Sequence, residues 1–140
     1  IVSMSESIYT QVRLKKAPGE IIYQDDICFV ILTIMPNNPG HMLLIPNQEV
    51  ADWQDIAPND FSHMMALAQK LGKITKQIYN PPKVALSSVG FEVPHVHIHI
   101  FSLFKIADID HSSAKQTTPE AMRIEADKIR AAIKQQGLVE

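Results

Sequence analysis

The chain has 140 residues, a formal net charge of −2 at pH 7, 46% hydrophobic residues and 20% charged residues. This length predicts one domain with a single core, and the charge balance lacks the basic footprint of proteins that bind nucleic acid polymers. No apolar run approaches the roughly 18 to 20 residues needed to cross a bilayer, and no cationic and then apolar signal opens the sequence, so we expect no membrane partner.

The single cysteine, Cys28, falls in an apolar run and has no partner for an internal disulfide. Such a thiol is more often an inert core residue than a nucleophile, and a chain without disulfides is typical of the cytoplasm. Ile1 to Ser3 precede a methionine, Met4, and we expect them to be a remnant in front of the native start. These features predict a cytoplasmic protein with one domain over residues 1–140.

The first half of the chain predicts a short helix and three strands. The elements expected in order are a helix over residues 6–14 capped by Ser5, strands over 20–24 and 27–35 joined by a turn at Asp25-Asp26, a third strand over 41–45, and a loop with a short helical turn over 49–57. Pro18-Gly19 ends the helix, and the turn formers of residues 36–40 separate the second and third strands.

The second half predicts two amphipathic helices and two more strands. The expected elements are a helix from Pro58 to Asn80, a strand over 83–89, a bend over 90–94, a strand over 94–101, and a last helix from Thr118 to Gly137. The apolar stripes of the helices are Phe61, Met64, Ala68, Leu71, Thr75 and Ile78, and then Met122, Ala126, Ile129 and Ile133. Together the elements predict an α+β fold, a five-stranded antiparallel sheet with helices packed on one face.

Three histidines, His95, His97 and His99, occupy every second position of the fifth predicted strand. Successive side chains of a strand point to opposite faces, so the three imidazoles are predicted to share one face while Val96 and Ile98 enter the core. Imidazole titrates near neutral pH and can act as a nucleophile, a proton carrier or a metal ligand. The row is therefore a candidate site.

Other histidines divide between this site and the surface. His41 begins the third predicted strand, which the sheet can place beside the row as a fourth imidazole, whereas His63 and His111 are predicted to be solvated surface residues. Two chemistries fit the row. His-x-His on a strand can present two ligands to a zinc ion, although Glu92 is the only acidic neighbour in the segment. Alternatively, a neutral imidazole attacks phosphorus while its neighbours orient it and carry protons.

The sequence also resembles a known family. His95 to Phe101 is similar to the His-φ-His-φ-His-φ-φ signature of the histidine triad (HIT) nucleotide hydrolases, in which φ is an apolar residue. The segments from Ile22 to Asp26 and from Pro36 to Pro46 resemble the family's N-terminal half. The resemblance covers about residues 5–104 and leaves residues 105–140 as a C-terminal extension with a helix.

The resemblance implies a homodimer whose two sheets join into one ten-stranded sheet, with a purine nucleotide or nucleotide conjugate in each cleft. It implies that His97 attacks the α-phosphorus, that His99 and His41 hold and polarise His97, and that His95 helps to position the phosphate or the leaving group. The implied activity is that of a nucleotide phosphoramidase or nucleoside-phosphoryl hydrolase without a cofactor. No metal is expected, because the Cys-x-x-Cys zinc motif of some relatives is absent.

The match to the family also suggests substrate-binding residues. The candidates are Ile22, Phe29 and Ile31 for a purine, Thr33 for the ribose, Ser87 or Ser88 for phosphate oxygens, and Glu92 for a cationic leaving group. Each of the three apolar residues is by default a core residue instead. Thr33 stands where many relatives carry Asp or Asn, and a hydroxyl cannot clamp a diol bidentately. Glu92 would repel a phosphate unless it points away or pairs with a cation. A zinc-dependent hydrolase and a non-catalytic nucleotide-binding protein therefore stay as alternatives.

Overall fold

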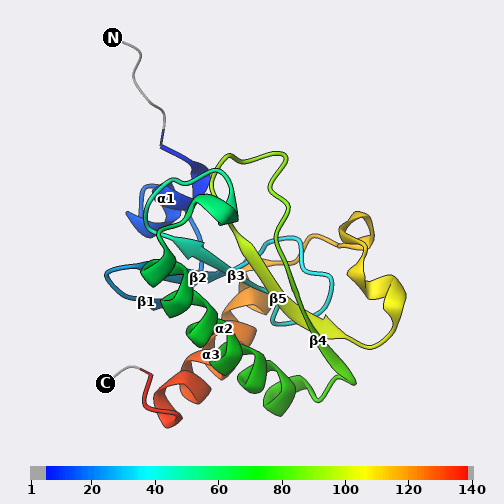
Figure 1. Ribbon diagram of the computed structural model, residues 1–140. Coiled ribbons are helices and arrows are strands. Elements are labelled where there is room, and N and C mark those ends of the chain that lie inside the picture. The colour runs from blue at the N-terminus through cyan, green and yellow to red at the C-terminus, as the bar shows by residue number, and fades with distance from the viewer. Residues whose placement is uncertain (1–5, 139–140) are drawn as a thin grey trace.

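A computed structural model of the chain describes residues 6–138 (Figure 1), so Ser5 and the expected remnant Ile1–Ser3 lie outside the described residues. The elements are α1 (Ile8–Arg13), β1 (Ile21–Gln24), β2 (Cys28–Leu32), β3 (Met42–Pro46), α2 (Pro58–Tyr79), β4 (Lys83–Ser87), β5 (Ile98–Leu103) and α3 (Pro119–Gln135), with short 3-10 helices at Trp53–Asp55, Ile106–Ile109 and His111–Ser113. Among the described residues, no helix combines the length and apolar character needed to cross a membrane.

The five strands form one antiparallel sheet in the order β1-β2-β3-β5-β4, which confirms the predicted sheet. The strands do not follow one another in chain order, because β5 lies between β3 and β4. The 22 residues of α2 span about 33 Å, so the chain crosses the sheet before β4 begins. The position beside β3 stays open and is filled by β5. The register pairs Leu43 with His99 and His99 with Ser87, so these three side chains lie on one face of the sheet.

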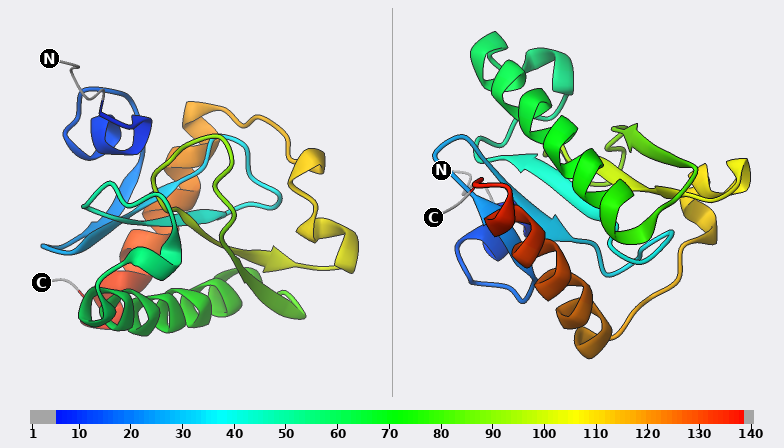
Figure 2. Two further views of the ribbon diagram at one scale, coloured as in Figure 1. Left: turned by 45° about the horizontal axis from the view of Figure 1, so that its top comes forward. Right: turned by 90° about the horizontal axis from the view of Figure 1, so that it is seen from below.

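The two long helices, α2 and α3, cover one face of the sheet (Figure 2). Their predicted stripes are confirmed, since Met64, Ala68, Leu71, Thr75, Met122, Ala126, Ile129 and Ile133 are all buried. Val96, Ile98 and Ile100 enter the same core, as the alternation of the histidine segment predicts. The short helix α1 differs, because its Tyr9 and Val12 pack on the opposite face, against Ile31 and Leu43 among others. That opposite face carries the histidines.

Several element boundaries differ from the predicted ones for local reasons. Ser7 rather than Ser5 is the N-cap of α1, because its side chain accepts a hydrogen bond from the backbone N–H of Thr10. The second strand ends at Leu32, and the hydroxyl of Thr33 then accepts a hydrogen bond from the N–H of Met35 in a turn. The fifth strand begins at Ile98, so only the last of the three histidines lies within a strand.

The C-terminal extension wraps over the loop between β2 and β3 and completes the core with α3. The backbone N–H groups of Lys115 and Thr117 donate to the carbonyl oxygens of Pro36 and Ile34, at 3.4 and 3.0 Å. In Figure 1 the orange segment runs beside the cyan loop. The extension therefore holds the loop that leads to His41.

Candidate active site

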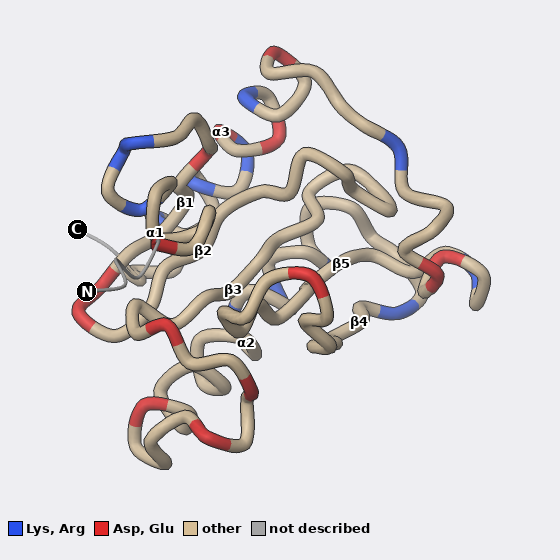
Figure 3. Tube along the Cα trace, turned by 90° about the horizontal axis from the view of Figure 1, so that it is seen from above, with Lys and Arg blue, Asp and Glu red and all other residues tan. Residues whose placement is uncertain are grey.

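The structure brings His41, His97 and His99 together on the sheet face opposite α2 and α3. The rings of His97 and His99 have centroids 5.3 Å apart, and those of His41 and His99 are 5.1 Å apart. Neither β3 nor β5 contains a Lys, Arg, Asp or Glu residue, and both strands are tan in Figure 3. The middle of this face is thus built from neutral groups.

His97 is 9% exposed and has one fixed ring nitrogen. Its Nδ1 lies 2.9 Å from the carbonyl oxygen of His95. A carbonyl oxygen only accepts, so Nδ1 carries the proton, and a neutral ring then keeps its lone pair on Nε2. The ring of Tyr9 in α1 lies 4.9 Å from the His97 ring on one side. His97 therefore presents a nucleophilic nitrogen from a ring held in place by its surroundings.

His41 and His99 form a directional hydrogen-bonded pair. The backbone N–H of Asn37 donates to Nδ1 of His41 at 3.1 Å, so the proton of His41 is on Nε2. That Nε2 donates to Nδ1 of His99 at 2.9 Å, which leaves the proton of His99 on Nε2. Burial, reinforced by neighbouring imidazoles, lowers the pKa of His41 and of His99 to about 3. Both rings are consequently neutral near pH 7.

His95 does not fit the implied contact with a phosphate or leaving group. Its side chain is completely buried, its Nε2 donates to the carbonyl oxygen of Pro46 at 2.7 Å, and its Nδ1 accepts from the hydroxyl of Ser7. Neither nitrogen is free for a ligand. His95 acts on the site through its backbone carbonyl, which holds His97, and this corrects the role that the resemblance implies.

The three residues suggested for a purine differ in their placement. Ile22 packs in the main core beneath α2 and α3, on the wrong face of the sheet, so this prediction is wrong. Phe29 is on the histidine face but has no exposed surface, because it is buried with Val12 of α1 and the Arg13 guanidinium lies 6.0 Å from its ring centroid. Ile31 is on the histidine face and 5% exposed, so it alone of the three is available to a base.

The polar candidates are placed unevenly around the histidines. Ser87 faces His99 across the β4–β5 pair, and its hydroxyl is buried without a hydrogen-bond partner, so it fits a phosphate donor better than Ser88. Ser88 follows β4, and both serines line an apolar cavity beside Trp53. The Thr33 hydroxyl accepts one hydrogen bond in a local turn, which leaves its O–H proton and one lone pair for a ligand. Glu92 is exposed; burial raises the pKa of the Tyr9 phenol, and the nearby charge of Glu92 raises it further.

Two residues of this site escaped prediction from the sequence. Tyr9 lies against His97, and its spacing from Val12 was the available signal, since residues three apart share a helix face. His111 is exposed, as predicted, but its ring also stacks on His99 with ring centroids 4.3 Å apart, a contact that the prediction of a surface residue does not include. No local pattern marks His111, because contacts distant in sequence bring it there.

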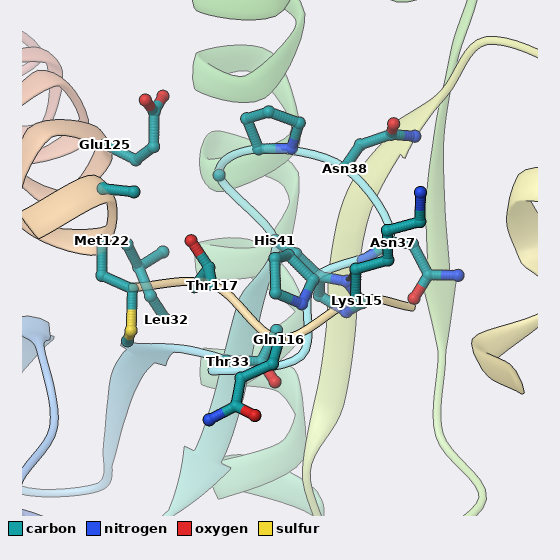
Figure 4. A pocket seen from close by; sticks show the side chains of 14 residues that line it. Leu32, Thr33, Asn37, Asn38, His41, Lys115, Gln116, Thr117, Met122 and Glu125 are labelled. Atoms are coloured by element: carbon teal, nitrogen blue, oxygen red, sulfur yellow. Dashed lines mark hydrogen bonds between the residues drawn. The ribbon is translucent and has the colours of Figure 1, made fainter. Parts of the chain in front are cut away.

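A cavity of about 270 Å³ lies between the β2–β3 loop and the C-terminal extension (Figure 4). Its lining includes Thr33 and His41 from the loop side, Thr117 from the extension, and Met122 and Glu125 from α3. Neither His97 nor His99 lines this cavity. It is formed only when the loop and the extension are both in place, and it adjoins the site through His41.

The histidine cluster is poorly arranged for a metal ion. His41, His99 and His111 each have a ring nitrogen within 4.8 Å of the others. The rings of His99 and His111 are stacked at an angle of 28°, however, so their in-plane lone pairs run side by side instead of converging as zinc ligands do. His41 and His99 are also already bonded to each other.

Comparison with known proteins agrees with this architecture. A protein of Mycobacterium tuberculosis named AP-4-A phosphorylase is 23% identical over 94 residues, which cover 63% of this chain and 48% of that protein. The purine nucleoside phosphoramidase of Escherichia coli K12 is 28% identical over 101 residues, which cover 68% of this chain and 85% of that protein. The chain spans 48% to 49% of the length of the first of its curated relatives.

Solved structures share the fold over most of the chain. The crystal structure of a Hit-like protein involved in cell-cycle regulation from Bartonella henselae has a TM-score of 0.79 at 24% identity, and the match covers 94% of this chain and 99% of that one. The model of the HIT domain matches residues 15–106, which contain the strands and all the triad histidines. The chain therefore belongs to the HIT domain family.

Proposed function

We propose that this protein hydrolyses phosphoramidate or phosphoanhydride bonds of purine nucleotides through a covalent nucleotidyl intermediate on His97. The observation that carries the proposal is the tautomer of His97, whose Nδ1 is bound to the carbonyl oxygen of His95 and whose Nε2 is left with a lone pair. The activities named for the M. tuberculosis and E. coli relatives, a phosphorylase of AP-4-A and a phosphoramidase, agree in acting on nucleotides.

The reaction would proceed in two displacements. In the first, Nε2 of His97 forms a bond to the α-phosphorus, and the bond from phosphorus to the leaving group breaks. The leaving group keeps the bonding electron pair and takes a proton from solvent. In the second, a water oxygen attacks the phosphorus, the P–Nε2 bond breaks, and the water proton passes to solvent. The Nε2–H of His99 and the hydroxyl of Ser87 are the donors on this face for phosphate oxygens as their charge increases.

We also propose that the protein acts as a cytoplasmic homodimer in which two sheets join into one of ten strands. Its support is the free edge of β4, where Leu86 is 56% exposed. Leu86 lines an open apolar cavity with Met65 of α2 and with Val84 and Ile100 of the sheet. A second copy that pairs along β4 would cover this surface. In the cytoplasm the buried Cys28 would stay a free thiol.

The test of the activity is turnover of adenosine 5′-phosphoramidate by purified protein, followed as release of the nucleoside monophosphate. His97→Ala should lower kcat by about 10³-fold or more, since no other described group offers a matching nucleophile. His63→Ala is the matched control, because His63 is bonded to Asp25 in a separate cluster and should leave kcat unchanged. Wild-type turnover by His97→Ala would exclude the covalent route. Tight nucleotide binding without turnover by the native protein would favour a binding protein.

A further inference from the structure

His111, from the C-terminal extension, closes the outer side of the His41–His99 pair. Its ring centroid is 4.3 Å from that of His99, 5.7 Å from that of His41 and 5.3 Å from that of Phe101. His99 thus has His111 stacked on its ring and His97 at 5.3 Å. The proposed chemistry uses the edge of His99, and the contact with His111 leaves that edge free.

Asn37 anchors both His41 and His111. Its backbone N–H donates to Nδ1 of His41, while its side-chain Nδ2 donates to the carbonyl oxygens of Asp108 and Asp110 at 2.8 and 3.0 Å. Because those carbonyl oxygens only accept, the amide is oriented with Oδ1 toward Nδ1 of His111, at 2.8 Å. Nδ1 of His111 therefore donates to Asn37, and a single asparagine fixes two of the three rings.

We propose that His111 is a positioning residue for the hydrolysis proposed above, which holds the ring of His99 so that its Nε2–H stays directed at the substrate phosphate. The proposal rests on the proposed function for its substrate. His41 fixes His99 at its edge through Nδ1, and His111 fixes it through its face. With both contacts in place, His99 has one orientation and one tautomer, which is the preorganisation that efficient charge stabilisation requires.

The surroundings of His99 also keep its ring neutral. The titratable groups that face it are His41 from the β2–β3 loop, His97 from the segment before β5, and His111 from the extension, while Asp110 lies beside His111. Burial is the main cause of the lowered pKa of His99, and the nearby imidazole of His111 adds to it. Removal of the His111 ring would expose the face of His99 to water and raise its pKa toward the ordinary value.

Two variants distinguish the effect of the stacked His111 ring from the effect of its hydrogen bond to Asn37. His111→Ala removes both, and His111→Phe keeps the ring but loses the donor to Asn37. We expect His111→Ala to lower kcat for adenosine 5′-phosphoramidate by about 10- to 100-fold with KM changed by less than about twofold. His111→Phe should recover part of the loss. His63→Ala, a surface histidine outside the site, should retain wild-type kinetics.

Nitrogen-15 spectra of the histidine rings provide a readout that packing alone would not move. In the native protein His99 should remain the Nε2–H tautomer from pH 7 to pH 5, and in His111→Ala it should titrate at a higher pH than in the native protein. An unchanged kcat in His111→Ala, or a raised KM at constant kcat, would overturn the positioning role. If the native protein has no turnover but His99 still titrates in His111→Ala, the proposed function fails and the coupling of His111 to His99 stands.

Discussion

His97 and His99 differ from ordinary surface histidines because protein groups of fixed polarity determine which nitrogen carries the proton. A carbonyl oxygen holds Nδ1 of His97, and a backbone N–H at Asn37 sets the direction of the His41–His99 pair. The result is a free lone pair on Nε2 of His97 beside an N–H donor on His99. In the proposed reaction the first ring attacks phosphorus while the second stabilises charge.

Loss of the His41 ring should impair the role of His99 as an N–H donor. In His41→Ala, Nδ1 of His99 has no donor, so the ring can change tautomer and turn its lone pair toward the phosphate. We expect kcat for adenosine 5′-phosphoramidate to fall by about 10²-fold with a small change in KM, and His41→Gln, whose amide N–H can replace the lost donor, to fall less. Steady-state kinetics below the melting temperature of every variant check this. Equal activity of His41→Ala and the native protein would contradict it.

The neutral imidazoles also predict how stability depends on pH. The pKa of His41 and of His99 is about 3 in the folded protein, against an ordinary value of 6.5. As pH falls below 6.5 the unfolded chain binds protons that the folded protein excludes, so the free energy of unfolding decreases until pH 3 and is constant above about pH 7.5. Each ring should contribute about 1 kcal/mol per pH unit to this decrease in the free energy of unfolding.

Urea unfolding between pH 7.5 and pH 5 measures this dependence. The range avoids Asp25, whose pKa is lowered to about 2 and which loses its stabilising effect only under more acidic conditions. His41→Gln should have a shallower slope than the native protein by about 1 kcal/mol per pH unit. An identical slope in the variant would mean that His41 has the same pKa in the folded and unfolded states.

For single residues, the sequence predicts the site histidines that a regular spacing marks. It fails for residues whose contacts are distant in the sequence. The two-residue spacing identifies His97 and His99, and the strand pairing expected for residues 41–45 brings in His41. The same spacing misassigns His95, because nothing local indicates that Ser7 and Pro46 occupy both of its nitrogens. The site role of His111 depends on contacts to Asn37, 74 residues away in the sequence.

The element that matters most for the site is the loop between β2 and β3, which ends in a tight turn before His41. Gly40 has a φ of +81°, a conformation that favours glycine, and a Cβ atom there would lie 2.3 Å from the ring of Tyr79. That ring cannot move away freely, because its hydroxyl donates to Glu125 at 2.7 Å. The turn therefore has no room for a side chain at position 40.

Gly40→Ala should accordingly destabilise the protein by about 2 to 4 kcal/mol, from the left-handed backbone and the collision with Tyr79 together. Thermal unfolding followed by circular dichroism checks the value. Gly137→Ala is the matched control, since Gly137 also has a positive φ, of 71°, but a Cβ atom there would meet nothing within 4 Å. It should lose only the backbone part, about 1 kcal/mol. Equal losses in the two variants would exclude the Tyr79 contact as a cause.

Hydrophobic periodicity predicts the helices and strands because each element buries one face or stripe. The stripes of α2 and α3 and the alternation from Val96 to Ile100 are confirmed in the core. The match to the family does not distinguish which face of the sheet Ile22 joins, and Ile22 lies in the main core instead of facing a purine. Periodicity contains no information on strand order, which depends on how far α2 carries the chain.

On the scale of the whole molecule, the free edge of β4 predicts association with a second copy. Leu86→Lys places a charge at the centre of the exposed apolar surface on this edge without entering the folded core. We expect the native protein to have the mass of two chains by light scattering and Leu86→Lys to have the mass of one. Ile124→Lys, at an equally exposed apolar position on α3, is the control and should remain dimeric. A native protein with the mass of one chain would contradict the dimer.

The C-terminal extension is the part of the molecule that sequence reasoning defines least. Its helix is predictable from the stripe that begins at Met122, but its contacts with the β2–β3 loop are not. Those contacts run through backbone groups at Pro36 and Lys115 and through the side chain of Asn37, none of which follows a periodic pattern. The extension is therefore part of the site, although the sequence motif contains only the triad.

The covalent step on His97 can be measured directly. Protein mixed with adenosine 5′-phosphoramidate is quenched by denaturation at neutral pH, digested, and analysed by mass spectrometry with fragmentation that keeps labile phosphorus–nitrogen bonds. We expect an adenylyl group on His97 in the native protein and none in His97→Ala. Turnover by the native protein with no adduct, or with the adduct on His99 instead, would contradict the nucleophilic role of His97.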